Sequence, residues 1–146
     1  MSNRIRLKET DPNTYKAMYA LEAYVDTVKD VSPLHKDLIR IRASQINGCG
    51  YCIDMHTRDA RKQGETEQRL YLLSVWREAP QFTAEEKIIL AITEEVTLIS
   101  ASGLSDETYN AAFAAFGAAK TAAIIMMVII INAWNRIGVA THMVPA

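Results

Sequence analysis

The chain has 146 residues, of which 49% are hydrophobic, and this is enough to build one domain with a sizeable core. Its 16 basic and 17 acidic residues almost cancel, which argues against nucleic acid or an anionic membrane surface as a partner. The polar start MSNRIRLKETDP predicts no signal peptide, and the most apolar run, residues 121–131, is too short to span a bilayer. We therefore expect a single domain over residues 1–146 in a soluble, cytoplasmic protein.

Helix signals follow one another along the whole chain. Ser32-Pro33 places a capping hydroxyl before a proline, and Thr83 with Glu86 forms a capping box. Gly117 is a typical helix terminator between two apolar helical stretches. The predicted helices cover residues 12–30, 33–46, 49–63, 65–78, 84–100, 106–116 and 118–142. Because no stretch alternates polar and apolar residues over a usable strand length, we predict an all-α bundle of about six to seven helices.

The last predicted helix is unusually apolar. From Ala122 to Ile131 every residue is apolar, so this segment leaves no face for water. A helix that is apolar all round is normally buried all round, and a small domain rarely encloses one by itself. We therefore expect a homo-oligomer. The alternative is that the other helices of the same chain wrap around this one.

Both cysteines of the chain lie in the stretch NGCGYCIDMH, residues 47–56. If a helix starts at Cys49, then Cys52 and His56 share one face with it. Residues three apart on a helix have Cα atoms roughly 5 Å apart, which a disulfide accepts. The free amides and dipole of a helix start favour a thiolate, and His56 is placed to accept a proton.

Two other interpretations of the cysteine pair remain open. Two buried, unreactive cysteines would show the same spacing. A structural zinc site is a sharper rival, but zinc normally takes four ligands and the chain has no second cysteine pair. Nothing in the spacing of His35 or His142 directs either histidine to the site.

The stretch R-x-S-Q-x-N-G-C-x-Y-C-x-x-x-H, with INAWNR near the end of the chain, resembles the alkylhydroperoxidase D-like (AhpD-like) family of the carboxymuconolactone decarboxylase superfamily. The resemblance is dense over residues 33–100. It implies an all-helical fold, oligomers that are commonly trimers or hexamers, and no bound cofactor. It also implies a small-molecule hydroperoxide as substrate and a dihydrolipoyl-type partner protein as reductant.

The resemblance assigns roles to four residues. Cys52 would be the nucleophile that attacks the peroxide bond, and Cys49 would resolve the resulting sulfenic acid as a disulfide. His56 would join a proton relay that an acidic residue completes, and the matching position is Asp37. Family members usually carry a glutamate at this position, and an aspartate is one methylene shorter. We therefore expect the proton relay to be water-bridged or weaker. Tyr51 stands where some members carry a histidine, which removes one titratable group from the site.

Two rival functions follow from the same sequence. Members of the superfamily that lack the cysteine pair are lactone decarboxylases, and a decarboxylase would keep its turnover without Cys52. A non-catalytic helical protein that senses redox state or holds zinc would be oxidised without turnover, or would bind metal stoichiometrically.

Overall fold

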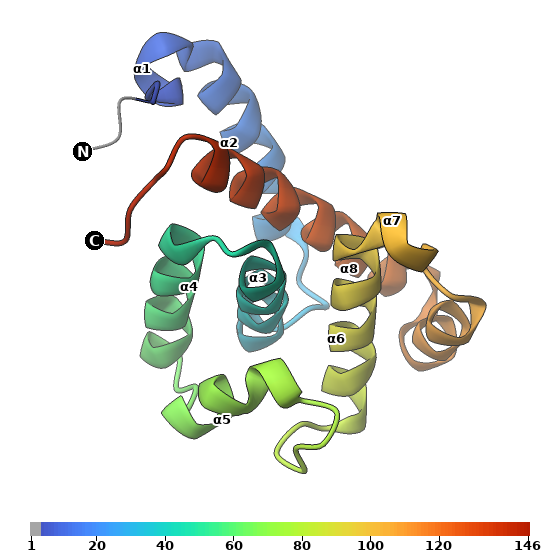
Figure 1. The fold of residues 1–146 in the computed structure, drawn as a ribbon. Helices are drawn as coiled ribbons and strands as arrows, with labels where there is room; N and C mark the ends of the chain where they lie inside the picture. Colours follow the sequence, from blue (N-terminus) through green and yellow to red (C-terminus); the bar gives the residue numbers. More distant parts are fainter. Residues whose placement is uncertain (1–3) are drawn as a thin grey trace.

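The structure is a computed structural model that describes residues 4–146, and this part of the chain is helical without any strand. The predicted all-α fold is confirmed (Figure 1). Two single-turn helices, one near the N-terminus and one after residue 98, were not predicted. The elements are α1 (Leu7–Thr10), α2 (Pro12–Thr27), α3 (Pro33–Asn47), α4 (Gly50–Lys62), α5 (Glu67–Leu72), the 3-10 helix η1 (Leu73–Val75), α6 (Ala84–Thr97), α7 (Ile99–Ser102) and α8 (Asp106–Ala140).

The capping signals in the sequence set the helix starts. The Ser32 hydroxyl accepts a hydrogen bond from the His35 amide at the start of α3. At the start of α6, Thr83 and Glu86 each accept a hydrogen bond from the other's backbone amide, so the predicted capping box is formed. These bonds satisfy amides that a helix start leaves without a partner.

The predicted helix over 65–78 is shorter in the structure. It becomes α5, and the chain then tightens into η1 before it leaves the helical path. Side chains three residues apart line up in a 3-10 turn, which brings Leu73 and Trp76 to the same side. Both are buried in the core beside α3, and the Trp76 indole donates a hydrogen bond to Glu94. The packing of these two side chains into the core therefore determines where α5 ends.

Helix α3 lies at the centre of the bundle, against α4, α6 and α8 (Figure 1). One group of buried side chains fills the space between α3, α6 and α8, and a second fills the space between α3, α4, α5 and η1. The central position of α3 brings its C-terminal end, and the start of α4 that follows it, against the last turns of α8.

Helix α8 contains the break predicted at Gly117, whose φ of 75° and ψ of 174° are not helical. Beyond this kink, Ile124 and Val128 are fully buried, whereas Ile129 is 46% exposed and Val139 is 44% exposed. The other helices of the chain therefore do not wrap α8 completely. By length and composition alone α8 could cross a membrane, but its buried face forms the core between α3 and α6, and we interpret it as a core helix.

Candidate active site

A buried network of side-chain amides fastens the end of α3 to α8. The Asn47 amide donates to the side-chain oxygens of Asn132 at 2.9 Å and Asn135 at 3.0 Å. The Asn135 amide donates in turn to the Ser44 hydroxyl at 2.9 Å, and Asn135 is fully buried. This network explains in physical terms why the N-G-C and INAWNR segments belong to one site: it fixes the start of α4 against α8.

Replacing Asn135 by alanine tests this network. The substitution leaves the Ser44 hydroxyl without its donor and removes one acceptor from Asn47 in a buried setting. We expect Asn135→Ala to lower the free energy of unfolding by about 2–3 kcal/mol in urea titrations. Asn110→Ala, at an exposed position on the same helix, is the control and should change it by less than about 0.5 kcal/mol. Equal losses in both variants would contradict a role for the network.

The two cysteines lie where the chain turns from α3 into α4. Gly48 ends α3 in the left-handed conformation, with a φ of 67°, as a helix-terminating glycine often does. Cys49 was predicted as the first helical residue but is instead the N-cap of α4, and its sulfur accepts a hydrogen bond from the Cys52 amide at 3.3 Å. Cys49 and Cys52 form a disulfide with Cα atoms 5.3 Å apart, and both are buried.

Gly138 lets the backbone of α8 pack directly against this disulfide. A Cβ atom at position 138 would lie 2.9 Å from the sulfur of Cys49 and 3.7 Å from that of Cys52. The first distance is too short for carbon and sulfur, so the position accepts only glycine without a local shift. Gly138 was not predicted as part of the site. Its signal was an isolated glycine inside a helical pattern, which often marks a close approach.

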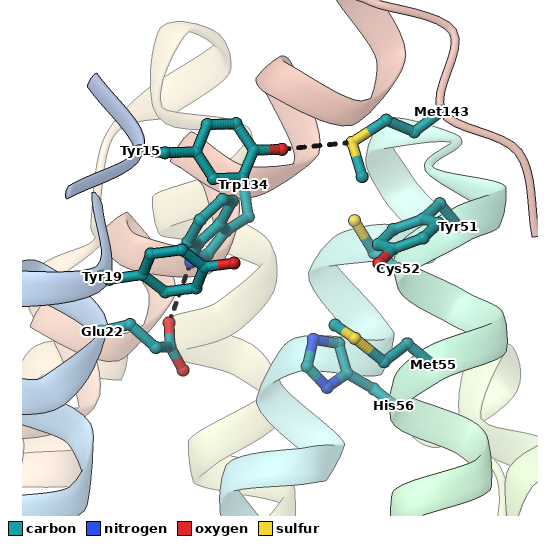
Figure 2. A pocket seen from close by; sticks show the side chains of 9 residues that line it. All are labelled: Tyr15, Tyr19, Glu22, Tyr51, Cys52, Met55, His56, Trp134 and Met143. Carbon is teal, nitrogen blue, oxygen red and sulfur yellow. Dashed lines mark hydrogen bonds between the residues drawn. The ribbon is translucent and has the colours of Figure 1, made fainter. Parts of the chain in front are cut away.

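A cavity of about 190 Å³ opens on the Cys52 side of the disulfide (Figure 2). Helix α4 supplies the Cys52 sulfur and His56, while α2 and α8 supply aromatic rings from the opposite wall. Tyr15 and Trp134 meet edge to face, with ring centroids 5.6 Å apart. The cavity is mostly apolar. Its lining consists of Tyr15, Tyr19, Glu22, Tyr51, Cys52, Met55, His56, Trp134 and Met143.

His56 lies one helical turn after Cys52 and contributes to the same cavity (Figure 2). The side chain is 8% exposed, and its Nδ1 atom has no hydrogen-bond partner among residues 4–146. Burial, with a smaller contribution from the nearby positive charge of Arg40, lowers the pKa of the imidazole to about 4. His56 is therefore neutral at pH 7, and its Nδ1 atom is available for a proton or a hydrogen bond.

Asp37 is buried in α3 but is not among the residues that line the cavity. Its carboxylate accepts a hydrogen bond from the Gln63 amide at 2.7 Å and faces the Arg40 guanidinium at 3.6 Å. Within residues 4–146 these are its partners, so the structure contains no direct bond from Asp37 to His56. Burial raises the pKa of Asp37 to about 6, against the opposing charge of Arg40.

The carboxylate that does line the cavity belongs to Glu22 (Figure 2). It accepts a hydrogen bond from the Trp134 indole at 3.0 Å and pairs with Arg40. Arg40 therefore lies between two carboxylates, Glu22 at the cavity and Asp37 behind it. Sequence reasoning missed Glu22 because its contacts with α3 and α8 exist only in the folded chain.

The two buried groups predict opposite pH dependences of stability. Because the pKa of Asp37 is raised, its contribution to stability falls as the pH rises from about 4 to 6. Because the pKa of His56 is lowered, its contribution is lost as the pH falls toward 4. We expect the free energy of unfolding of Asp37→Asn, measured in urea, to rise by about 2 kcal/mol relative to that of the wild type between pH 4 and pH 7. The free energy of unfolding of His56→Gln should fall by about 2 kcal/mol relative to that of the wild type over the same range. Parallel curves for all three proteins would contradict these assignments.

Comparison with known proteins places this arrangement in a family. The fold and the site define a class of all-helical proteins with a CxxC pair at the start of a helix. Residues 12–95 match the carboxymuconolactone decarboxylase family. The uncharacterized protein YdfG of Bacillus subtilis is 40% identical over 140 residues, which span 96% of this chain and 95% of that protein.

Solved structures agree with this placement. A protein of unknown function from Agrobacterium tumefaciens, for which a role as the antioxidant defence protein AhpD has been suggested, is 36% identical. It superposes with a TM-score of 0.95 over 99% of both chains. An uncharacterized peroxidase-related protein from Silicibacter shares the fold, at 24% identity and a TM-score of 0.77 over 92% of this chain and 69% of that one. The chain therefore belongs to the carboxymuconolactone decarboxylase family and is AhpD-like.

Proposed function

We propose that the protein is a thiol-dependent peroxidase that reduces organic hydroperoxides through the Cys49–Cys52 pair. The observation that carries the proposal is the position of Cys52. Its sulfur lines an aromatic cavity beside a neutral histidine, and it is bonded to the sulfur with which it would react. The proposed nucleophile and proton acceptor thus lie one turn apart on α4, and the proposed resolving thiol is the N-cap of the same helix.

The proposed reaction proceeds in two steps. In the reduced protein the Cys52 thiolate attacks the outer oxygen of the hydroperoxide, the O–O bond breaks, and the alcohol leaves after it takes up a proton. The Cys52 sulfenic acid then reacts with the Cys49 thiol, forming the disulfide and releasing water. The hydroperoxide gains two electrons, and the two thiols lose them. His56 takes the Cys52 proton and returns it to the alkoxide.

The proton relay is part of the proposal. His56 is one turn from Cys52, and Arg40 couples the cavity carboxylate of Glu22 to the buried carboxylate of Asp37. We assign Asp37 the role of a positioning residue that acts through Arg40, because its direct partners do not include the histidine.

The partners also remain proposals. A dithiol of the dihydrolipoyl type would return the disulfide to the reduced state, which is consistent with a cytoplasmic protein whose cysteines are redox-active. The exposed apolar residues of α8, including Ile129 and Val139, favour association of identical chains, and we propose a trimer or hexamer. No group of three or more His, Cys, Asp or Glu side chains within residues 4–146 is arranged to hold a metal ion.

Stopped-flow oxidation of the reduced protein tests the function. We expect cumene hydroperoxide to oxidise the wild-type thiols faster than it oxidises free cysteine, and faster than hydrogen peroxide does, because the cavity is apolar. The matched control is the double variant Cys49→Ser with Cys52→Ser, which should consume no hydroperoxide. A decarboxylase would instead keep its activity on a lactone in that double variant. Equal consumption by both proteins would exclude the peroxidase.

A further inference from the structure

The aromatic cavity is lined by thioether side chains as well as by the Cys52 sulfur. Among residues 4–146, the methionines that line it are Met55, on α4, and Met143, in the segment that follows α8. Figure 2 shows Met143 above Cys52 in the view and Met55 below it. A thioether has no proton to lose and can be oxidised to a sulfoxide whatever the state of the cysteines. The disulfide therefore leaves other oxidisable sulfur atoms in the cavity.

The position of Met143 is fixed by its backbone and by a tyrosine. Its amide donates a hydrogen bond to the Gly138 carbonyl at 2.9 Å, which ties residue 143 to the last turns of α8. Its Sδ atom accepts a hydrogen bond from the Tyr15 hydroxyl at 3.9 Å (Figure 2). This bond occupies one lone pair of the sulfur and leaves the other for an electrophile. The half-buried Met143 side chain is thus held at the cavity wall with a hydroxyl beside its sulfur.

Tyr15 places a proton where oxygen transfer to a thioether needs one. Burial, with smaller contributions from the phenols of Tyr19 and Tyr51, raises the pKa of Tyr15, so its hydroxyl keeps its proton at neutral pH. Attack of a thioether on a hydroperoxide produces an alkoxide and a protonated sulfoxide, and a hydroxyl beside the sulfur can carry the proton from one to the other. Within residues 4–146, the Met55 sulfur accepts no such hydrogen bond.

We propose that Met143 is a second oxidation site of this cavity: once the two cysteines are joined, an organic hydroperoxide that enters oxidises Met143 to the sulfoxide, which slows the reaction of later hydroperoxides with Cys52. The inference rests on the proposed function for the class of oxidant. In the reduced protein the Cys52 thiolate is the stronger nucleophile and reacts first. Met143 is oxidised when hydroperoxide is in excess and the disulfide persists.

The oxidation balances without any further reactant. The Met143 sulfur attacks the outer oxygen of the hydroperoxide, the O–O bond breaks, and its electron pair leaves on the alkoxide. The Tyr15 hydroxyl gives its proton to the alkoxide and takes one from the oxygen now bonded to sulfur. The products are one alcohol and one sulfoxide, so the thioether loses two electrons and the hydroperoxide gains them.

The sulfoxide would change the cavity in which the next hydroperoxide must bind. Its oxygen is a strong acceptor, and the Tyr15 hydroxyl that already bonds to the sulfur is placed to donate to it. The bond from the Met143 amide to Gly138 keeps the modified residue at the cavity wall. A polar group that is larger by one oxygen then stands in a mostly apolar space of about 190 Å³, so an apolar hydroperoxide binds there less well.

Peptide mass spectrometry tests the site. Wild-type protein is first converted to the disulfide with diamide, so that its cysteines cannot take up the oxidant, and is then incubated with cumene hydroperoxide. Met18, which is half-buried on α2 and does not line the cavity, is the internal control. We expect the sulfoxide to form at Met143 about tenfold or more faster than at Met18, and faster than at Met55. Equal rates at Met143 and Met18, or faster oxidation of Met55 than of Met143, would overturn the inference.

A tyrosine variant tests the role of the hydroxyl. Tyr15→Phe should slow sulfoxide formation at Met143 about tenfold and leave the rate at Met18 within about twofold of wild type. Tyr24→Phe removes a hydroxyl from the same helix outside the cavity and is the matched control. Unchanged oxidation of Met143 in Tyr15→Phe would contradict the assigned proton transfer.

The effect of the sulfoxide is measured on the modified protein. After the hydroperoxide treatment the cysteines are reduced with a phosphine at neutral pH, and oxidation of the thiols by cumene hydroperoxide is followed by stopped flow. We expect it to be about fivefold slower than in untreated protein, whereas treated and untreated Met143→Leu should differ by less than about twofold. An unchanged rate in the treated wild type would overturn the proposed slowing.

Failure of this inference and failure of the proposed peroxidase give different results. The sulfoxide is mapped with both cysteines in the disulfide, so the outcome does not depend on the reactivity of Cys52. Selective oxidation of Met143 in a protein whose reduced thiols do not react with hydroperoxide would refute the peroxidase and support Met143 as an oxidation site. Reactive thiols without selective oxidation of Met143 would refute the inference and leave the peroxidase standing.

Discussion

Cys52→Ser is expected to abolish hydroperoxide reduction, with a loss of roughly 1,000-fold or more in rate. The reason is that the Cys52 sulfur is the cysteine sulfur that lines the aromatic cavity, so no other thiol of the protein meets a hydroperoxide there. Stopped-flow measurement of alcohol release from cumene hydroperoxide gives the rate.

Cys49→Ser is the matched control, because it removes the sulfur three residues away, which does not line the aromatic cavity. This variant should keep the first step within about tenfold of wild type but lose the disulfide, so that Cys52 stops as a sulfenic acid. The assignment of roles would be reversed if Cys49→Ser alone abolished alcohol release. The peroxidase itself would fail if neither substitution changed the rate.

Gly138→Ala is expected to destabilise the disulfide form by about 1–3 kcal/mol, because the added methyl group would lie 2.9 Å from the Cys49 sulfur. The sulfur is held by its bond to Cys52 and cannot swing away, so α8 must shift instead. Reduction frees the Cys49 side chain to rotate, and the loss should be smaller in the dithiol form. Urea unfolding with and without reductant measures both values.

Gly50→Ala is the control for that experiment. Gly50 is the first residue of α4, next to Cys49, but its added Cβ would be 3.6 Å from Pro145, which is an ordinary contact. This variant should stay within about 0.5 kcal/mol of wild type in both forms. A Gly138→Ala protein as stable as the wild type when oxidised would show that α8 does not pack against the disulfide as described.

The sequence predicted the fold wherever a local signal set the boundary. The Ser32 and Thr83 caps and the Gly117 break all have counterparts in the structure. Local signals did not predict helix boundaries that tertiary packing sets. At η1, for example, the predicted helix ends early because Leu73 and Trp76 both pack into the core. Incomplete burial of this last helix was expected from its apolar composition, but which residues stay exposed, such as Ile129, depends on how far neighbouring helices reach around α8.

Only the part of the candidate site that lies on α4 could be predicted from the sequence. The cysteine pair and His56 follow from spacing within α4, whereas the aromatic wall comes from α2 and α8, far away in sequence. Trp134, which we would assign to packing from its sequence context, lines the cavity and holds Glu22 through its indole. The partners of Asp37 likewise depend on the distance between α3 and α4, which no local pattern encodes.

The most direct test of the proposed redox cycle is a count of electrons. Reduced wild-type protein receives half an equivalent of cumene hydroperoxide under argon, and the cumyl alcohol, the remaining free thiols and the intact mass are then measured together. The cycle predicts one alcohol and one Cys49–Cys52 disulfide for every hydroperoxide consumed, with two thiols lost. Hydroperoxide that disappears while both thiols survive, or that is not consumed at all, would contradict it.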